Sequence, residues 1–240
     1  AELDPKLVSE ARALEVQYMY KLKVYVEATW AEMQALGCKP IPTRWLDTDK
    51  GDATNPEIRS RAVAQETKRR SSIAATDIAA TFAATPPLEG VRLLLSLATS
   101  GNYGVPDELR RVLGFYDISR AHFHSPVRRD IFIIPPKEDT SIKTGLARLL
   151  KAMYGTRDAG QCFDNFAESS MSTLGFVTGV FNPCIYYHKD RNAVCVRHGD
   201  DFVLLADRST QGWFFKGLGE LMITKCVGVL GPCKAKGDQQ

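Results

Sequence analysis

The chain has 240 residues, of which 44% are hydrophobic and 25% charged, and its formal net charge at pH 7 is +3. This composition is ordinary for one large domain or two small subdomains, and it excludes a disordered or fibrous protein. The longest apolar runs, residues 91–98 and 202–206, are too short to cross a bilayer, so no membrane span is expected.

The cysteines and the first residues bear on cellular context. Six cysteines lie at positions 38, 162, 184, 195, 226 and 233 without a short paired spacing, so neither a zinc site nor a disulfide framework is expected. Reduced thiols in an intracellular compartment are the simpler interpretation. Residues 1–13 start with Ala rather than Met and lack the pattern of a secretory signal, so we expect a piece of a longer protein.

Basic residues gather in two places although the net charge is small. The first cluster includes one acid, Glu66, and its basic members are Arg59, Arg61, Lys68, Arg69 and Arg70. The second comprises Arg110, Arg111, Arg120, Arg128 and Arg129. Such clusters can follow a phosphate backbone by neutralising its charge. A solvated surface face is the simpler explanation, so charge alone does not identify a nucleic-acid partner.

The predicted elements of the first half begin with a helix capped by Asp4 and Pro5 that continues to about residue 20. A short strand follows at 22–26, where apolar residues alternate with others. Residues 43–49 and 58–65 predict a hairpin around a turn-rich stretch, with basic residues on its second arm. Residues 71–85 predict a loose connector. Residues 87–99 have the spacing of a helix buried on one face.

The second half alternates strands and helices. Strands are predicted at 112–118 and 130–134, followed by helices at 146–154 and 159–174 that are divided by the turn 155–158. Three more strands are predicted at 185–188, 193–198 and 202–206, then a helix at 211–222 and a strand to residue 230. Helices and mainly antiparallel strands in irregular order predict an α+β fold.

Two adjacent carboxylates stand at a predicted turn between apolar strands, in the sequence HGDD at 198–201. Neighbouring side chains on a strand point to opposite faces, but at a turn Asp200 and Asp201 can lie near the same end of the hairpin. Adjacent anions repel each other, and a divalent cation relieves that repulsion. A solvated turn is the simpler explanation for an isolated pair, because Asp is a favoured turn residue.

A third carboxylate, Asp117, follows an apolar strand and precedes Ser119 and Arg120. An acid at the end of a strand can be a metal ligand held on a rigid element, which is the placement a two-metal site requires. Alone, it is also consistent with a helix cap. Phosphoryl transfer needs few groups beyond carboxylate-held metals and cations set against phosphates, so three acids and nearby arginines can suffice.

A series of short motifs stands in order along the chain. The motifs are KPIPTRW at 39–45, RSRAVAQ at 59–65, RLLLSLA at 92–98, YDISRAHF at 116–123, AMYGTRDA at 152–159, LGF at 174–176, HGDD at 198–201 and VLG at 229–231. This series resembles the polymerase domain of copia-type retrotransposon polyproteins. The resemblance spans nearly all of residues 36–230, and no single motif decides it.

The resemblance implies an RNA-directed DNA polymerase, or reverse transcriptase, with a right-hand fold that lacks the thumb. Residues 1–85 would be the N-terminal segment and fingers, and 86–240 the palm with part of the fingers at about 124–150. Asp117, Asp200 and Asp201 would be the catalytic triad and would hold two Mg²⁺ or Mn²⁺ ions. The expected partners are an RNA or DNA template with its primer and a deoxynucleoside triphosphate, with no membrane.

The resemblance also implies which residues bind the nucleotide. The backbone of Ile118 and Ser119 would lie against the triphosphate, and Arg61 would pair with its phosphate oxygens. His122 stands where the family carries a bulky aromatic residue that closes off the sugar 2′ side. Arg157 preserves the charge of a family lysine.

Several positions depart from the family pattern. His122 keeps bulk but can hydrogen-bond a ribose, and Asp158 replaces an amide expected near the nucleotide or template. A thumb beyond Leu230 is also missing from the pattern. These departures favour a second hypothesis, a catalytically inactive retroelement remnant with residual nucleic-acid binding, whereas the intact acids favour the polymerase. An unrelated metal-dependent phosphohydrolase explains the acids but not the ordered motifs. The family implies cytoplasmic particles with later nuclear entry.

Overall fold

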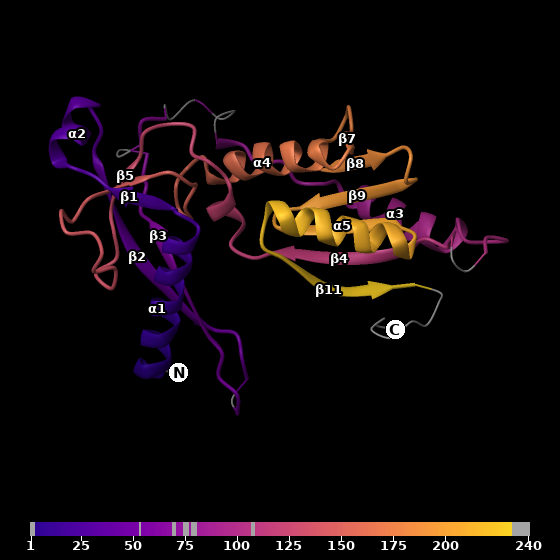
Figure 1. Cartoon of the computed structure of the whole chain (residues 1–240), viewed down its shortest axis with the longest axis horizontal. Helices are drawn as coiled ribbons and strands as arrows, with labels where there is room; N and C mark the ends of the chain where they lie inside the picture. The colour runs from indigo at the N-terminus through magenta and orange to yellow at the C-terminus, as the bar shows by residue number, and fades with distance from the viewer. Residues whose placement is uncertain are drawn as a thin grey trace. The chain divides into compact units, whose positions relative to one another are not determined.

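The computed structural model describes residues 3–52, 54–68, 71–73, 77, 81–106 and 109–231. The chain divides into two compact units. Unit 1 combines Ala1–Phe82 with His122–Phe163, and unit 2 combines Ala83–Ala121 with Asp164–Gln240. Helices and strands occur in both units (Figure 1), which confirms the predicted α+β class.

Unit 1 is built on a mixed sheet. Its strands, within the described ranges, are β1 (Tyr25–Glu27), β2 (Pro40–Asp49), β3 (Ile58–Ala64), β5 (Phe132–Ile134) and β6 (Ala147–Leu149), in the spatial order β1-β6-β5-β2-β3. The pair β2 and β5 is parallel, while the other pairs are antiparallel. Its helices are α1 (Pro5–Lys21) and α2 (Trp30–Ala35).

The core of unit 1 forms where α1 packs against the sheet, beside β3. Met19 of α1 is buried there with Val24, Ile41 and Ile133. The helix begins as its sequence predicts, because the Asp4 side chain accepts a hydrogen bond from the Lys6 amide and Pro5 occupies the first turn. Burial of these side chains removes apolar surface from water and stabilises the unit.

Unit 2 holds a six-stranded antiparallel sheet in the part of the chain that the structure describes. Its strands are β4 (Val112–Ile118), β7 (Val177–Thr178), β8 (Ile185–His188), β9 (Ala193–His198), β10 (Asp201–Ala206) and β11 (Thr224–Leu230), in the order β11-β4-β10-β9-β8-β7. The helices α3 (Leu88–Ser100) and α5 (Arg208–Leu221) belong to this unit. The helix α4 (Ala159–Thr173) and the short 3₁₀ helix η3 (Ala121–His124) cross the boundary between the units.

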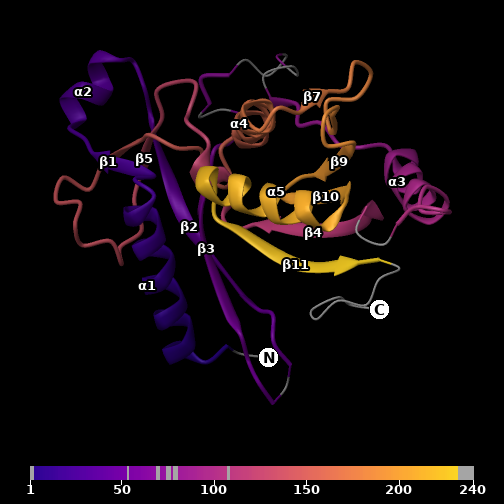
Figure 2. The same cartoon turned by 45° about the vertical axis from the view of Figure 1, so that its right-hand side comes forward.

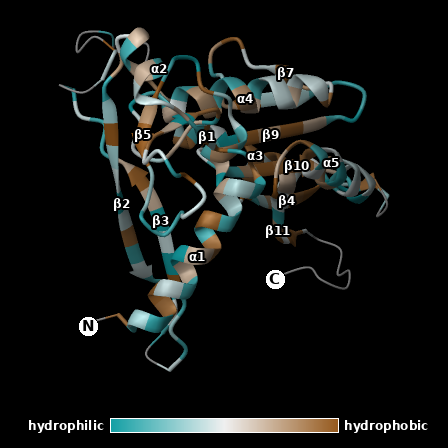
Figure 3. Ribbon diagram, turned by 60° about the vertical axis from the view of Figure 1, so that its left-hand side comes forward, coloured by the Kyte–Doolittle hydropathy of each residue, from teal (hydrophilic) through white to brown (hydrophobic). Residues whose placement is uncertain are grey.

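The two faces of this sheet carry different helices. Phe214 of α5 makes an edge-to-face contact with Tyr116 of β4, with ring centroids 5.3 Å apart. Figure 2 shows α5 lying across β10 and β4. Leu94 of α3 is buried with Leu113 and Val196, and these strand residues point away from α5 because side chains alternate along a strand. Strand β9 is coloured as hydrophobic along most of its length in Figure 3, as a strand covered on both faces requires.

Gln211 fixes α5 to the sheet. Its buried side-chain amide donates to the carbonyl oxygens of Val112 and Leu204, at 2.8 and 3.0 Å, and its Oε1 accepts from the Tyr116 hydroxyl at 2.6 Å. A Cβ at Gly114 would overlap that oxygen. A buried amide with its hydrogen bonds satisfied holds a helix in one register on a sheet.

Most predicted elements are confirmed within a few residues, and one is wrong. The predicted helix at 146–154 does not form. Residues 147–149 are strand β6, which pairs with β1 and β5, and no regular element follows it up to Tyr154. A short apolar run has no decisive periodicity, and pairing between distant strands determined its conformation. The short strand predicted at 22–26 lies instead at Tyr25–Glu27, because Lys23 has a positive φ of 50° just after α1.

Helix α2 was not predicted, although the sequence contains its start signal. The Thr29 hydroxyl accepts a hydrogen bond from the Glu32 amide at 3.1 Å, in the threonine-x-x-glutamate pattern of a capping box. The connector predicted at 71–85 lies partly outside the described residues, as do Arg69, Arg70 and Cys233. Five described cysteines carry free thiols, and none of the described helices is long and apolar enough to span a membrane.

Candidate active site

The hairpin of β9 and β10 carries the adjacent carboxylates of unit 2. His198 pairs with Asp201, so Gly199 and Asp200 form a two-residue loop. Gly199 has a φ of 63°, and Asp200 is not among the residues with positive φ. A positive φ at the first loop residue alone fits a type II′ turn, whose twist matches that of the flanking strands. Glycine is suited to that position, and its presence places Asp200 at the tip.

Sheet register brings Asp117 beside this hairpin. Asp201 of β10 pairs with Asp117 of β4, and Asp117 pairs on its other side with Lys225 of β11. Cross-strand partners point to the same face of an antiparallel sheet. A row of charged or polar residues therefore crosses four strands in the order Lys225, Asp117, Asp201 and His198.

The carboxylates influence one another electrically. The pKa of the Asp201 carboxyl is raised above its ordinary value by partial desolvation, and then by the negative charges of Asp200 and Asp117, while His198 lowers it. Asp201 is exposed as a residue, so desolvation here means crowding at the sheet surface rather than full burial. An acid whose ionised form is disfavoured by desolvation and by two neighbouring carboxylates is a place at which a cation binds favourably.

The backbone beside the carboxylates is already hydrogen-bonded. The Ile118 amide donates to the Asp200 carbonyl oxygen at 3.0 Å, and the Ser119 amide donates to the Ile223 carbonyl oxygen at 2.9 Å. Both predicted phosphate-contacting residues thus lie next to the acids at the end of β4. Their amide groups are engaged within the protein, so contact with a triphosphate in this conformation must use other atoms.

The metal-binding prediction has one structural test. Among the described residues, no three His, Cys, Asp or Glu side chains come close enough together to hold a metal ion as they stand. The backbone nevertheless sets Asp117 and Asp201 opposite each other and Asp200 next in sequence. Carboxylate oxygens are the ligands that Mg²⁺ and Mn²⁺ prefer. The type of donor fits those ions.

A groove of about 570 Å³ opens beside Asp201 in unit 2. Its lining is largely apolar and comes from β4, β10 and β11, with Val91 of α3. The other residues that line it are Phe115, Tyr116, His198, Phe202, Val203 and residues 227–230. The carboxylate row therefore borders a concave apolar surface.

The remaining predicted site residues belong to unit 1, and Tyr154 links two of them. The Arg61 guanidinium lies 4.9 Å from the centre of the Tyr154 ring, and the His122 ring lies 4.8 Å from it in an edge-to-face contact. Arg61 and His122, 61 residues apart in sequence, thus contact the same aromatic side chain. Both are half-buried, which leaves part of each side chain open to solvent.

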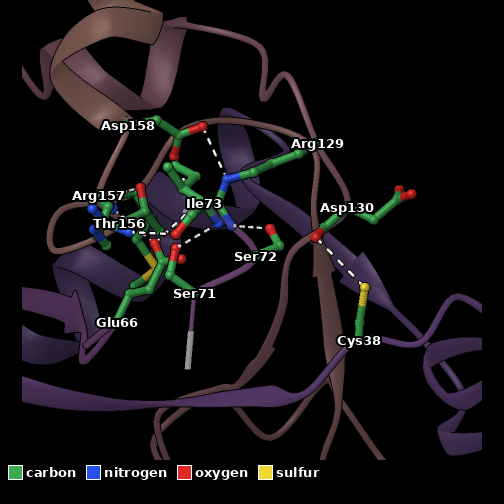
Figure 4. A network of polar contacts seen from close by, with 11 residues as sticks. Cys38, Glu66, Ser71, Ser72, Ile73, Arg129, Asp130, Thr156, Arg157 and Asp158 are labelled. Carbon is green, nitrogen blue, oxygen red and sulfur yellow. Dashed lines mark hydrogen bonds and ion pairs between the residues drawn. The ribbon is translucent and has the colours of Figure 1, made fainter. Parts of the chain in front are cut away.

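Arg157 lies in a polar network within unit 1 (Figure 4). Its guanidinium donates to the Ile73 carbonyl oxygen at 2.7 Å, and its backbone amide donates to Glu66 Oε2 at 2.7 Å. Arg129 pairs with the same Glu66 oxygen at 2.7 Å and with Asp158 at 2.8 Å. The Glu66 and Asp158 side chains are 0% and 3% exposed.

This network revises the expectation for Asp158 and for the basic clusters. The Asp158 carboxylate is buried against Arg129, so in this conformation both of its oxygens accept hydrogen bonds within unit 1. Glu66 and Arg129, one from each predicted cluster, form an ion pair, whereas Arg59, Lys68 and Arg128 are exposed, as expected for a solvated face. Charge counting along the sequence cannot detect a pair whose members are 63 residues apart.

Four residues that contact or neighbour the predicted site residues were not singled out by the sequence: Tyr154 in unit 1, and Gln211, Lys225 and Arg197 in unit 2. Arg197 carried a detectable signal, because it is a lone cation in an otherwise apolar strand next to the HGDD turn. Lys225 had none, since only the register of β11 against β4 places it opposite Asp117.

Two comparisons with known proteins bear on the family of this chain. Residues 29–220 match the family described as "Reverse transcriptase (RNA-dependent DNA polymerase)". The chain is also 22% identical over 205 residues to the "Retrovirus-related Pol polyprotein from transposon TNT 1-94" of Nicotiana tabacum, a match that covers 82% of this chain. The matched part is 14% of the length of that polyprotein. The chain belongs to the reverse transcriptase (RNA-dependent DNA polymerase) family, as a copia-type domain.

Proposed function

We propose that this chain is an RNA-directed DNA polymerase module that adds deoxynucleotides to a primer 3′-hydroxyl with release of pyrophosphate. The observation that carries the proposal is the strand register that places Asp117 opposite Asp201, with Asp200 at the adjoining turn. Family membership supports it, since the three acids lie in motifs through which the chain resembles that family.

The three carboxylates have a defined task in this proposal. Asp117, Asp200 and Asp201 would hold two Mg²⁺ or Mn²⁺ ions, and these ions would supply activation of the primer hydroxyl and offset the charge of the triphosphate. Partial desolvation, and then the charges of Asp200 and Asp117, raise the pKa of Asp201, and a bound cation would favour its ionised form. Asp117 and Asp201 lie on strands bonded into one sheet, which keeps them from separating.

The residues of unit 1 supply the nucleotide contacts in this proposal. Arg61 pairs with triphosphate oxygens through its planar guanidinium, and Tyr154 restricts the directions that the side chain can take. His122, against the same ring, borders the sugar. Arg157 is the weakest of the three assignments, because its guanidinium already serves the Ile73 carbonyl. Unit 1 then corresponds to the fingers and unit 2 to the palm.

The second candidate is an inactive remnant that still binds nucleic acid. The observation in its favour concerns Asp158. The family pattern has an amide side chain at this position, whereas here the side chain is a carboxylate in a buried ion pair with Arg129. The two candidates differ in whether phosphodiester bonds form, so an activity measurement separates them.

Primer extension on a poly-ribonucleotide template tests the proposal, with Mg²⁺ or Mn²⁺ at low salt. We expect extension by this chain and a loss of at least about 100-fold in Asp200→Asn, because removing one carboxylate removes a metal ligand. Asp190→Asn, at an exposed turn of the same unit, is the matched control and should extend normally. Template binding without extension would support the remnant, and the absence of both would leave only family membership.

A further inference from the structure

The side chain of Arg197 is buried directly behind the turn that carries Asp200. It belongs to β9, and its side chain is 1% exposed. Arginine stays charged in proteins, and a buried charge without a partner is strongly destabilising. A strand of this kind is stabilised more simply by an apolar residue, so the contacts of this cation require an explanation.

The guanidinium contacts several groups of unit 2, among them the Cys184 Sγ at 3.9 Å from Nη2. Its Nη2 pairs with Asp164 Oδ1 at 2.8 Å, and its Nη1 donates to the Gly199 carbonyl oxygen at 3.1 Å. Its Nε lies 3.4 Å from the Tyr186 hydroxyl. The rigid fork of donors lets one side chain hold an acid on α4 and a carbonyl of the turn at once.

Asp164 is itself fixed on two sides. Its Oδ1 accepts from Arg197, and its Oδ2 accepts from the Ala84 backbone amide at 2.7 Å. The Asp164 side chain is 14% exposed. The acid therefore anchors the guanidinium to α4 and to the segment before α3, and the guanidinium transmits that fixed position to the turn.

Both peptide groups that flank Asp200 are hydrogen-bonded as a result. In the peptide group before Asp200, the Gly199 carbonyl oxygen accepts a hydrogen bond from Arg197. In the peptide group after it, the Asp200 carbonyl oxygen accepts from the Ile118 amide of β4. Register places Arg197 opposite Phe202, whereas His198 is opposite Asp201. Arg197 thus supports the turn from the face of the sheet opposite to the row of acids.

We propose that Arg197, held by Asp164, is a positioning residue that fixes the Gly199–Asp200 peptide and so sets the direction of the Asp200 carboxylate toward Asp117 and Asp201. This inference rests on the proposed function for its catalytic consequence. The hydrogen bonds themselves do not depend on it.

The test removes the fork without leaving a buried charge. The double variant Arg197→Met with Asp164→Asn replaces the ion pair by neutral groups, and the asparagine oxygen still accepts from the Ala84 amide. The matched control is Arg12→Met with Asp47→Asn, which neutralises a 2.7 Å ion pair of unit 1 that lies outside the site. Arg197→Lys is a second variant that keeps the charge but has no planar fork, in case the double variant does not fold.

The first readout is hydrogen exchange of the Ile118 amide, followed by NMR, because it reports the turn without any activity. We expect exchange at least about 10-fold faster in the double variant and in Arg197→Lys than in the control, at an unchanged urea midpoint. The second readout is primer extension across a Mn²⁺ titration, where we expect a 10- to 100-fold lower rate and a higher half-saturating Mn²⁺ concentration, as misplaced groups lose about that much.

The outcomes separate the two proposals. Unchanged Ile118 exchange and unchanged Mn²⁺ dependence in both Arg197 variants would overturn the positioning role, even if the parent chain extends primers. Faster exchange in the variants, together with no extension by the parent chain under either metal, would support the role in holding the turn and count against the polymerase.

Discussion

At the scale of single residues, Asp201 illustrates how position changes chemistry. Asp200 and Asp201 lie at the β9–β10 turn, and Asp117 lies on the neighbouring strand β4. Partial desolvation, and then the charges of the other two acids, raise the pKa of Asp201. In unit 1, Asp158 has an opposite role, because it is buried in an ion pair with Arg129 and takes no part in the carboxylate row. Residues of the same type thus lie in a row of neighbouring acids at one place and in a buried ion pair at the other.

Asp201→Asn should make the folded protein more stable at pH 7. Because the folded-state pKa is raised, the native state binds more protons than the unfolded state, and stability falls as pH rises from about 4 through the raised value. Asparagine removes this loss. We expect a gain below about 1 kcal/mol, since the residue is exposed, and a gain that shrinks towards pH 4. Urea unfolding of both proteins between pH 4 and 8 measures it.

Asp190→Asn serves again as the comparison for that measurement. If both asparagine variants change the free energy of unfolding equally at every pH, the raised pKa of Asp201 is not the cause of the gain in stability. A gain confined to Asp201→Asn, together with lost primer extension, would show that this position exchanges stability for function.

At the scale of elements, hairpin geometry determines where the acids point. The β9–β10 loop is two residues long. The positive φ of Gly199 gives the turn a twist that matches the twist of the two strands. Gly155, before the network of Arg157, has a φ of 85° and lies against the Ala64 carbonyl oxygen. Both glycines occupy a left-handed conformation, but only Gly155 also lacks space for a side chain.

Alanine substitutions at these two glycines should therefore differ in cost. At Gly199 no atom lies within 4 Å of an added Cβ, so we expect only the left-handed penalty of about 1–2 kcal/mol. At Gly155 an added Cβ would overlap Ala64, and we expect a loss of more than about 3 kcal/mol or failure to fold. Urea midpoints of the two variants decide this, and equal losses would contradict the difference in packing.

At the scale of the whole molecule, the predicted site residues divide between the two units. The acids with Ile118 and Ser119 belong to unit 2, and Arg61, His122 and Arg157 belong to unit 1. The formal net charge of +3 is small, so any nucleic-acid affinity must come from local groups and should depend on salt. The salt dependence of template affinity and the KM for the nucleotide therefore report on two different sets of contacts.

Arg61→Ala should raise the KM for the incoming nucleotide by about 10-fold or more, because a charge-assisted pair to phosphate contributes about 1.5–3 kcal/mol. If Arg61 contacts the triphosphate and not the template, the salt dependence of template binding should stay the same. A decrease of about one in the slope of log K against log salt would instead assign Arg61 to the template backbone. Arg92→Ala, at an exposed site of α3, is the charge-matched control.

The strands and helices with clear periodicity could be predicted from the sequence alone, as could the α+β class and the family. Strand β4 and the HGDD hairpin were predictable because alternation and turn chemistry are local properties. The same locality explains why the helix at 146–154 was predicted wrongly, since pairing with β1 and β5 outweighed a weak local preference. Three contacts could be seen only in the tertiary structure. Asp117 pairs with Asp201, and Asp158 is buried against Arg129. Arg197 donates to the Gly199 carbonyl oxygen. These contacts join residues through strand register and side-chain direction, which depend on the whole sheet and cannot be derived from one segment.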